Sequence, residues 1–328
     1  MKQHAQWGPC PTEHGTHSNH WNLMIRFLAY RLLQSLLVVV CVYSATFWLL
    51  MAAPGDPFIG EKKPPESVLK ALREKYHIDQ PAKAYVWYAW RAVRYGDLGQ
   101  TISYENWTVR EVIASSLPVS VALGSLALLR ALGIGVMGGT VGAVYKGRWL
   151  DHALTTATLL GVSLPTFVIG AGLLMAFVVA WPLLPAGGWG TLRQVILPAA
   201  TLALFYLAYI SRLTRASVLD VLGADYVRTA RAKGLAEYQV ITSHVLRNAS
   251  LPILSYLGPA AATVLTGSFV AEKVFAIPGL GTHFVNACLN GDIPLVLGAV
   301  MVYTVLVVGF NLLVDLAYVF ADPRISLN

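Results

Sequence analysis

Six long apolar blocks, separated by polar segments, dominate the hydrophobicity pattern of the chain. A helix of about 20 residues crosses the roughly 30 Å hydrocarbon core of a bilayer, and each block is close to or above that length. Five blocks contain no Lys, Arg, Asp or Glu, and the second contains only Arg130. The pattern predicts an all-α integral membrane protein with six transmembrane helices. The predicted spans are Leu32–Ala53, Val112–Tyr145, Ala153–Trp181, Gln194–Ser211, Asn248–Ala271 and Ile293–Val314.

Composition agrees with this fold class. The hydrophobic set makes up 56% of the 328 residues and charged residues 12%, and the mean hydropathy is +0.58. Soluble domains carry roughly 25% charged residues, and a soluble chain this apolar would expose large apolar surface patches. The three cysteines are too few and too far apart for a disulfide framework or a thiolate metal site.

The basic residues orient the predicted spans. The net charge of +7 needs no nucleic-acid partner, because Lys and Arg collect in the cytoplasmic loops of membrane proteins. With the N-terminus inside, the two short outer loops hold only Arg193 and Lys273. The pattern predicts that both termini are cytoplasmic. The basic residues on the inner side are then Arg26, Arg31, Lys146, Arg148, Arg212, Arg215, Arg228, Arg231, Lys233, Arg247 and Arg324.

The same pattern divides the chain into four segments. Residues 1–23 form a polar, His-rich extension without an apolar h-region, which we interpret as disordered, or as upstream of a true start at Met24. Metal binding by its histidines is the other interpretation. Residues 24–53 read as a signal anchor and 54–111 as an extracytoplasmic loop region. Residues 112–328 form the transmembrane core, with a cytoplasmic loop at 212–247.

The extracytoplasmic segment carries two local signals. Glu66–Tyr76 has apolar residues at helical spacing, which predicts a short amphipathic helix. An aromatic run follows, of the composition that favours a membrane–water interface. We interpret it as a lid on the bilayer face rather than as a ligand site. Its residues are Tyr85, Trp87, Tyr88, Trp90 and Tyr95.

Small residues and a proline predict how the spans pack. Gly135 with Gly139, and Gly138 with Gly142, form overlapping G-x-x-x-G pairs that let helix backbones approach closely. Pro165 is expected to kink the third span. Both features suit helices packed around a path and a static bundle equally.

Motifs for catalysis or nucleotide binding are missing from the sequence. It contains no G-x-x-x-x-G-K-[ST] P-loop, no H-E-x-x-H zinc motif and no G-x-S-x-G nucleophile elbow. The predicted spans contain no Asp, Glu or His, which ion-coupled carriers and intramembrane enzymes would be expected to need. We therefore expect a non-enzyme without catalytic residues, metal or cofactor, energised by another chain.

Arg130 is the one charged residue inside a predicted span. A charge at the bilayer centre costs about 2.5–3.5 kcal/mol on insertion scales, so Arg130 is a candidate for the wall of a water-filled path. Alternatively, its long side chain snorkels toward one interface.

The inner segment between the fourth and fifth spans is the strongest candidate site. Asp225 can cap a short helix that runs to Lys233, and Gly234 can end it in a left-handed conformation. A second helix would follow. Two short basic helices joined by a glycine predict a docking surface, and a solvated loop with a membrane-surface helix is the alternative. The face expected on the second helix is Tyr238, Ile241, Val245 and Leu246.

This segment resembles the permease subunits of ABC importers, in particular the dipeptide/oligopeptide permease family. The similarity rests on DYVRTARAKGL (Asp225–Leu235) followed by LRNASLP (Leu246–Pro252). The general importer loop has Glu-Ala-Ala six residues before its glycine, where this chain has Arg228, Thr229 and Ala230. That departure is typical of the peptide-permease branch.

Six further motifs extend the resemblance over nearly the whole chain from Met24, in the family's order. They are MIRFLAYRLLQ (Met24–Gln34), APGDP (Ala53–Pro57), YGDLGQTI (Tyr95–Ile102), GVSLPTF (Gly161–Phe167), EKVFAIPGLG (Glu272–Gly281) and NLLVDLAYVFADPRI (Asn311–Ile325).

The resemblance implies a multi-pass inner-membrane permease of the type I ABC importer architecture. It implies three kinds of protein partner besides membrane lipid: a homologous second permease, two cytoplasmic ATP-binding subunits that bind the ATP, and an extracytoplasmic solute-binding protein. The ATPase-coupling residues it implies are Asp225, Tyr226, Arg228, Thr229, Ala230, Arg231 and Gly234.

The resemblance also implies the substrate class, which is dipeptides or oligopeptides. Nickel complexes, glutathione or another small solute are the alternatives within the same family. An ion-coupled secondary transporter is the alternative from a different class, and the acid-free spans disfavour it.

Overall fold

The computed structural model describes residues 16–52, 79–104, 106–265 and 269–321, together with 67, 70, 73, 74, 76 and 77. Within these residues the chain is helical, and its only extended pairing is an isolated antiparallel bridge between Gln100 and Thr108. The helices are α1 (Thr16–Ala52), α3 (Pro81–Tyr95), α4 (Val109–Val144), α5 (Trp149–Ser163), α6 (Thr166–Leu174), α7 (Leu192–Leu222), α8 (Asp225–Ala232), α9 (Glu237–Gln239), α10 (Leu246–Leu265), α11 (Phe269–Val274), α12 (Leu280–Leu289) and α13 (Ile293–Ala321); π-helical segments η2 (Met175–Ala180) and η3 (Val240–Val245) extend α6 and precede α10.

Among the described residues, four helices are long and apolar enough to cross a membrane, and they correspond to four of the predicted spans. These are α1, α4, α7 and α13. A fifth candidate exists if the bent pair formed by α5 and α6 with η2 counts as one span. The prediction of a multi-pass helical membrane protein is confirmed at this level.

The remaining predicted span, Asn248–Ala271, corresponds to α10. This helix has 20 residues, which is about 30 Å at 1.5 Å per residue. It contains Pro252 and Pro259, and it is not among the candidates selected by length and hydropathy. Residues 266–268 lie outside the described part of the chain.

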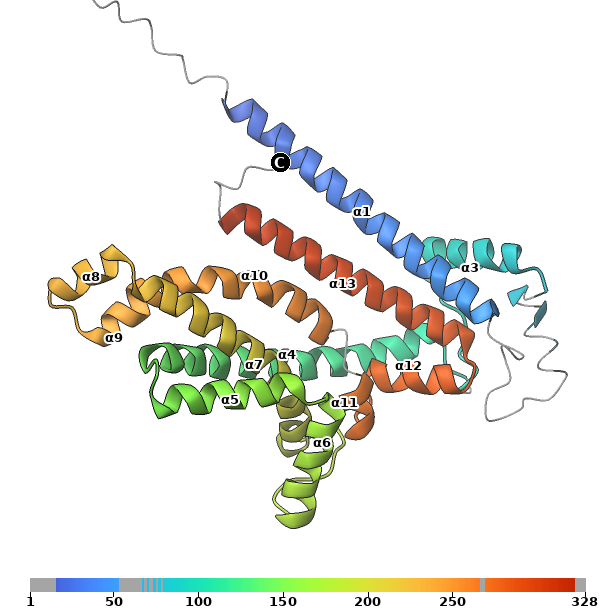
Figure 1. The fold of residues 1–328 in the computed structure, drawn as a ribbon. Coiled ribbons are helices and arrows are strands. Elements are labelled where there is room, and N and C mark those ends of the chain that lie inside the picture. Colours follow the sequence, from blue (N-terminus) through green and yellow to red (C-terminus); the bar gives the residue numbers. More distant parts are fainter. Residues whose placement is uncertain are drawn as a thin grey trace, which may run out of the picture.

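The third predicted span is interrupted by more than a kink. Helix α5 ends at Ser163, Pro165 occupies the N-cap position of α6, and the two helices meet at 108°. Proline has no backbone N–H and disfavours helical geometry at the preceding residue, here Leu164, whose backbone is extended. The prediction of one helix over Ala153–Trp181 was wrong, and Figure 1 shows α6 projecting away from the bundle.

The glycine pairs confirm close helix packing. A Cβ on Gly139 would lie 2.4 Å from the backbone oxygen of Ser211 in α7, and one on Gly135 would lie 3.0 Å from that of Leu207. Only a residue without a side chain allows α4 and α7 to approach this closely. The main apolar core lies between these helices and α10 and α11.

Helix α1 lies alongside α13, where Arg31 forms an ion pair with Asp315 at 3.2 Å.

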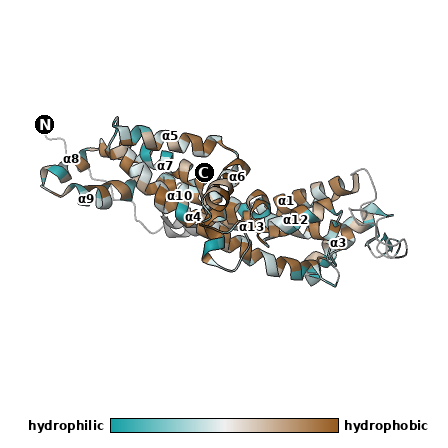
Figure 2. Ribbon diagram, turned by 90° about the horizontal axis from the view of Figure 1, so that it is seen from below, coloured by the Kyte–Doolittle hydropathy of each residue, from teal (hydrophilic) through white to brown (hydrophobic). Residues whose placement is uncertain are grey.

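The bundle places the short helices α8 and α9 and the helix α3 at opposite ends. Helices α8 and α9 lie at one end of the molecule and α3 at the other in both views (Figures 1 and 2). Figure 2 shows the long helices as mainly hydrophobic, as expected for lipid-facing elements.

Two predicted segments near the N-terminus are covered only in part by the described residues. Helix α1 begins at Thr16, so it extends into the segment 1–23 that was expected to lack structure. Residues 1–15 lie outside the described residues, as does most of the predicted helix Glu66–Tyr76.

Candidate functional site

The predicted docking segment forms a helix–turn–helix that we call the elbow, residues 225–239. Helix α8 begins one residue earlier than expected, because Ala224 occupies the N-cap position with an extended backbone. The prediction that Asp225 caps the helix was wrong. Asp225 lies in the first turn, where an acid still interacts favourably with the helix dipole, and its exposed carboxylate pairs with Arg228 at 3.5 Å.

Gly234 makes the turn in the left-handed conformation, as predicted. Its φ is +78°, and its N–H donates to the carbonyl oxygen of Arg231 at 3.0 Å. A Cβ built on Gly234 would meet no heavy atom within 4 Å. A side chain here would therefore be opposed by backbone strain and not by crowding.

The second predicted helix, formed by α9 and η3, has the predicted buried face only in part. Val245 is buried and Leu246 packs against the same apolar cluster, as predicted. Val240 is also buried, whereas Tyr238 is 76% exposed. The reason is η3, in which hydrogen bonds run from residue i to i+5 and place Val240 and Val245 on the same side. The predicted face assumed the 3.6-residue period of an ordinary α-helix.

An apolar cluster supports the elbow against the rest of the bundle. From α8 it takes Val227 and Ala230, which are 0% and 5% exposed. Ala230, one of the residues that the resemblance assigns to ATPase coupling, therefore faces the protein's own apolar cluster. The other buried members come from α4, α7, η3 and α10, and they are Ala143, Val218, Val240, Val245 and Ala249.

Polar contacts close the exposed side of the elbow. Arg231 and Glu237 form a two-pronged ion pair across the turn, with N–O distances of 3.1 and 2.6 Å. The hydroxyl of Tyr226 accepts a hydrogen bond from Asn248 at 2.7 Å. The Thr229 hydroxyl donates to the Asp225 carbonyl oxygen at 3.0 Å.

Charge on the elbow is predominantly basic and accessible. The Arg228 side chain is 73% exposed, and Lys233 is also exposed. The hydrogen bonds from Arg231 hold the pKa of Glu237 below its ordinary value, and the same contact raises the pKa of Arg231. Both groups therefore stay charged at neutral pH and offset each other, and the exposed Arg228 and Lys233 supply the basic charge of the elbow.

Arg130 lies far from the elbow. Its guanidinium donates a hydrogen bond of 3.3 Å to the carbonyl oxygen of Ile196 in the first turn of α7. The elbow follows the last turn of that helix. The structure thus places Arg130 against a helix end and does not bring it together with the other predicted site residues.

Two buried carboxylates, Asp292 and Glu272, join separate elements of the chain by hydrogen bonds, and we call them the clamp. Asp292 is fully buried at the start of α13 and accepts a hydrogen bond of 3.1 Å from the Leu295 N–H, as an N-cap does. Its second oxygen accepts hydrogen bonds from the N–H groups of Ile102 and Ser103, both at 2.9 Å, and from the Thr101 hydroxyl. One side chain thereby joins α13 to the loop that precedes α4.

Glu272 in α11 is the second carboxylate of the clamp. It is 0% exposed, and it accepts hydrogen bonds from the Ser120 hydroxyl at 2.8 Å and the Thr282 N–H at 3.2 Å. Ser120 in turn accepts from the Leu280 N–H at 2.9 Å. Burial raises the pKa of Glu272, and the hydrogen bonds from Ser120 and Thr282 offset this in part.

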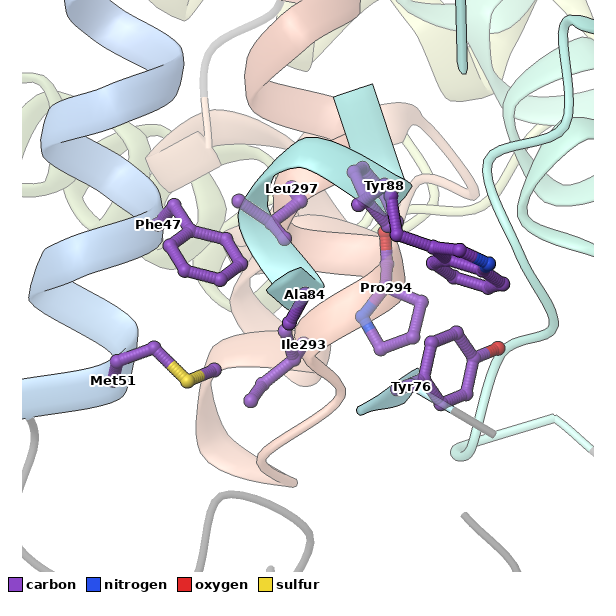
Figure 3. Close-up of a pocket in the computed structure, with 9 residues that line it drawn as sticks. Phe47, Met51, Tyr76, Ala84, Tyr88, Ile293, Pro294 and Leu297 are labelled. Carbon is purple, nitrogen blue, oxygen red and sulfur yellow. The ribbon is translucent and has the colours of Figure 1, made fainter. Parts of the chain in front are cut away.

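Beside the clamp, the aromatic face of α3 packs against the protein itself. Tyr88 is buried, and its hydroxyl donates to the carbonyl oxygens of Leu98 and Pro294. Tyr85 packs on Tyr43 of α1, with ring centroids 4.9 Å apart. Figure 3 shows Phe47 and Met51 of α1 with Tyr88 and Pro294 around a small apolar cavity of about 20 Å³.

Sequence reasoning missed the clamp residues and one further ion pair. Asp292 had a readable signal, because Asp before Ile-Pro and an apolar block marks a helix start. Arg215 of α7 binds the buried Asp151 of α5 at 2.6 and 2.8 Å. No local sequence pattern predicts such a pair.

Across the described residues, no group of three or more His, Cys, Asp or Glu side chains is placed to hold a metal ion.

Comparisons with known proteins fit the elbow and the bundle. Residues 131–327 match the family described as "Binding-protein-dependent transport system inner membrane component". The oligopeptide transport system permease protein OppB of Haemophilus influenzae is 40% identical over 305 residues, covering 92% of this chain and 99% of that protein. The dipeptide transport system permease protein DppB of Bacillus subtilis is 38% identical over 306 residues, covering 93% and 99%.

One solved structure shares the fold. It shows inward-facing conformations of the MetNI methionine ABC transporter, and it matches with a TM-score of 0.50 at 17% identity. The match covers 63% of this chain and 93% of the other.

Proposed function

The chain belongs to the family of binding-protein-dependent transport system inner membrane components, and on that premise we propose that it is a permease subunit through which an ATP-driven ABC importer moves dipeptides or oligopeptides. One observation carries the substrate class: the chain aligns over nearly its full length with an oligopeptide permease at 40% identity. The dipeptide permease at 38% identity supports the same class.

We propose six membrane crossings with both termini in the cytoplasm. The candidate spans and the bent α5–α6 pair supply five, and α10 would supply the sixth because its 20 residues are long enough to cross. The basic residues of 212–247 then face the cytoplasm, and the α3 region within 54–111 faces outward. In this proposal residues 24–53 act as the signal anchor.

The proposed partners follow from the same family. A second homologous permease would complete the transmembrane unit, two cytoplasmic ATP-binding subunits would hydrolyse ATP, and an extracytoplasmic binding protein would deliver the peptide. This chain would hold no cofactor of its own.

We propose that the elbow is the element that receives the ATPase motion. Its contact surface is formed by the exposed side chains of Tyr226, Arg228 and Thr229, with Arg231 and Asp225 at the rim. Ala230 contributes from beneath, because its small side chain lets α8 sit closely on the apolar cluster. The cluster joins the elbow to α4, α7 and α10, so a displacement of α8 would be passed on to three long helices.

Gly234→Asp tests this proposal. The substitution places a side chain at a φ of +78°, which costs on the order of 1 kcal/mol, so the chain should fold and insert. The change in the turn and the added negative charge should weaken docking of the ATP-binding subunits. We expect loss of their co-purification and of ATP-dependent uptake of trialanine into vesicles.

Gly96→Asp is the matched control, because Gly96 has a φ of +61° and open space around a Cβ, at the α3 end of the molecule. It should retain ATPase association and uptake. If Gly234→Asp behaves like Gly96→Asp, the elbow is not the coupling element. If the wild-type complex takes up nickel complexes or glutathione but no peptide, the substrate class is wrong.

We propose that Arg130 anchors α4 to the first turn of α7 and does not line the path. Its hydrogen bond to the Ile196 carbonyl oxygen supports this role, since a guanidinium that snorkels to a helix end avoids the bilayer centre. Arg130→Ala should leave peptide uptake within about twofold of wild type, a change equivalent to less than about 0.5 kcal/mol. A marked change in substrate preference would instead place Arg130 on the path.

A further inference from the structure

Helix α7 is the central helix of the bundle and has one open face. It contacts α4, α5, α6, α10 and α11 (Figure 1). Its Ile210 packs against Gly135 of α4, and its Ala208 packs against Gly161 of α5. Neighbours therefore cover these faces, and the exposed residues at the middle of α7 lie between them.

The open face carries aromatic and basic side chains. Phe205 is 41% exposed and Tyr209 43% exposed, and Arg212 is also exposed. These residues are spaced i, i+4 and i+7, so they lie on one side of the helix. They mark a single stripe that begins midway along α7 and runs toward the elbow.

A tyrosine of α10 joins this stripe. The rings of Tyr209 and Tyr256 stack with centroids 4.2 Å apart at an interplanar angle of 26°. Tyr256 lies midway along α10, as Tyr209 does along α7. Tyr209 lies near the inner end of the predicted span Gln194–Ser211 and Tyr256 in the inner half of Asn248–Ala271, so the stacked pair lies in the cytoplasmic half of the membrane in the proposed topology.

The polar groups of this stripe lack partners within the described residues. Neither the hydroxyl of Tyr209 nor that of Tyr256 makes a hydrogen bond to them, and Arg212 forms no ion pair with them. A hydroxyl that faces hydrocarbon without a partner costs several kcal/mol on water-to-alkane scales. Arg212 adds a positive charge at the cytoplasmic end of the stripe. The stripe is therefore unsuited to lipid and suited to a polar occupant.

Arg212 also borders a hollow. With Thr155 and Thr158 of α5 and Ser211 of α7, it lines a pocket of about 110 Å³ between α4, α5 and α7. The occupant that meets the stripe must accept hydrogen bonds, carry negative charge near Arg212 and tolerate aromatic rings.

We propose that Phe205, Tyr209, Arg212 and Tyr256 form the part of the translocation path that contacts the peptide. This inference rests on the proposed function. Phenol hydroxyls donate to and accept from amide groups, the rings pack on peptide side chains, and the guanidinium pairs with the terminal carboxylate. The stripe would thus select for peptides by their backbone and charged end, while its aromatic surface tolerates different side chains.

A photoreactive residue at position 205 tests which molecule contacts the stripe. The transporter complex is purified from its own host through a tag on this chain, with p-benzoylphenylalanine in place of Phe205, and reconstituted with its binding protein and ATP. The matched control has the same residue in place of Tyr30, which is 62% exposed on α1. We expect radiolabelled trialanine to become attached at position 205 and not at position 30.

Conservative variants supply the second readout. Tyr209→Phe and Tyr256→Phe each remove a hydroxyl and keep the ring, so folding and ATPase association should be unchanged. At saturating binding protein, the ATP-dependent uptake rate of trialanine should fall about two- to tenfold, the range expected for one lost hydrogen bond. Arg212→Gln should reduce the uptake of trialanine more than that of trialanine amide, which lacks the carboxylate.

The remaining outcomes contradict the proposal. Attachment of position 205 to another protein chain would assign the stripe to the interface with the second permease. Unchanged uptake by all three variants, in a complex that imports trialanine, would overturn the path assignment and leave the proposed function standing. A wild-type complex that imports no peptide would overturn both.

Discussion

The clamp and the elbow hold charged groups in opposite ways. At the clamp, Asp292 and Glu272 are fully buried, and their oxygens accept hydrogen bonds from backbone N–H and hydroxyl groups. At the elbow, Arg228 and the Arg231–Glu237 pair remain exposed, and the buried contacts are apolar. A buried carboxylate with several donors is costly to disturb, whereas exposed pairs cost little to rearrange.

The difference assigns different mechanical tasks to the two regions. The clamp fixes the chain between α3 and α4 to the start of α13, which stabilises one arrangement of that end. The elbow packs on the apolar cluster through its buried side, and its exposed polar atoms remain available to a partner. A region that must dock a second protein keeps its charges on the surface, and a region that must hold its own shape buries them.

Removal of the Asp292 carboxylate should have the largest effect. Asp292→Ala leaves the N–H groups of Ile102, Ser103 and Leu295 without their acceptor, at about 1–3 kcal/mol for each buried donor. We expect a loss of at least about 3 kcal/mol in unfolding free energy, measured by thermal unfolding in detergent. Asp220→Ala, at an exposed position of α7, is the control and should change stability by less than about 0.5 kcal/mol. Equal effects would mean that the clamp does not stabilise this end.

Overpacking of the apolar cluster beneath the elbow should have the next largest effect on stability. Ala230→Leu adds three carbons to a side chain that is 5% exposed, and such insertions cost about 1–3 kcal/mol. Ala236→Leu is the control in the same turn, because Ala236 is exposed. Protease sensitivity of the elbow in the isolated chain should rise for Ala230→Leu only. A silent Ala230→Leu would indicate that position 230 belongs to the docking surface after all.

The two regions should respond to pH with opposite sign. The pKa of Glu272 is raised above 4.5 by burial, so the clamp loses stability as pH rises from about 4.5 through that higher pKa. Glu272→Gln should flatten this slope in thermal unfolding measured from pH 4 to 8. The pKa of Glu237 is lowered, so the elbow keeps its ion pair above pH 4.5 and loses it as pH falls further. Slopes of the same sign would contradict the contrast between the two regions.

Loss of the exposed ion pair should have the smallest effect. Glu237→Gln removes a pair whose side chains are 52% and 42% exposed, worth about 0–1 kcal/mol. Hydrogen exchange of α8 should increase slightly, and global unfolding should be unchanged. Thr229→Ala is the control within the same helix, since it also removes a polar side chain but leaves the pair intact. A large loss of global unfolding free energy for Glu237→Gln would mean that the elbow is stabilised by charge and not by the apolar cluster.

Features that depend on local chemistry could be predicted from the residues alone. Apolar length predicted α1, α4, α7 and α13, because a lipid environment requires continuous helices of that length. Gly234 predicted the left-handed turn, because few other residues adopt positive φ without cost. The ordered family motifs predicted the permease family, since they are read directly from the residues.

Contacts between residues that are far apart in the sequence depend on how the helices pack. Asp292 binds Thr101, which lies 191 positions away, and Arg215 reaches Asp151 only because α5 packs beside α7. The π-helical segment η3 buried Val240 and left Tyr238 exposed, against the ordinary helical period. Local patterns record the preference of each residue for helix, turn or lipid. They carry no record of which faces meet, because that is settled by packing among all the helices at once.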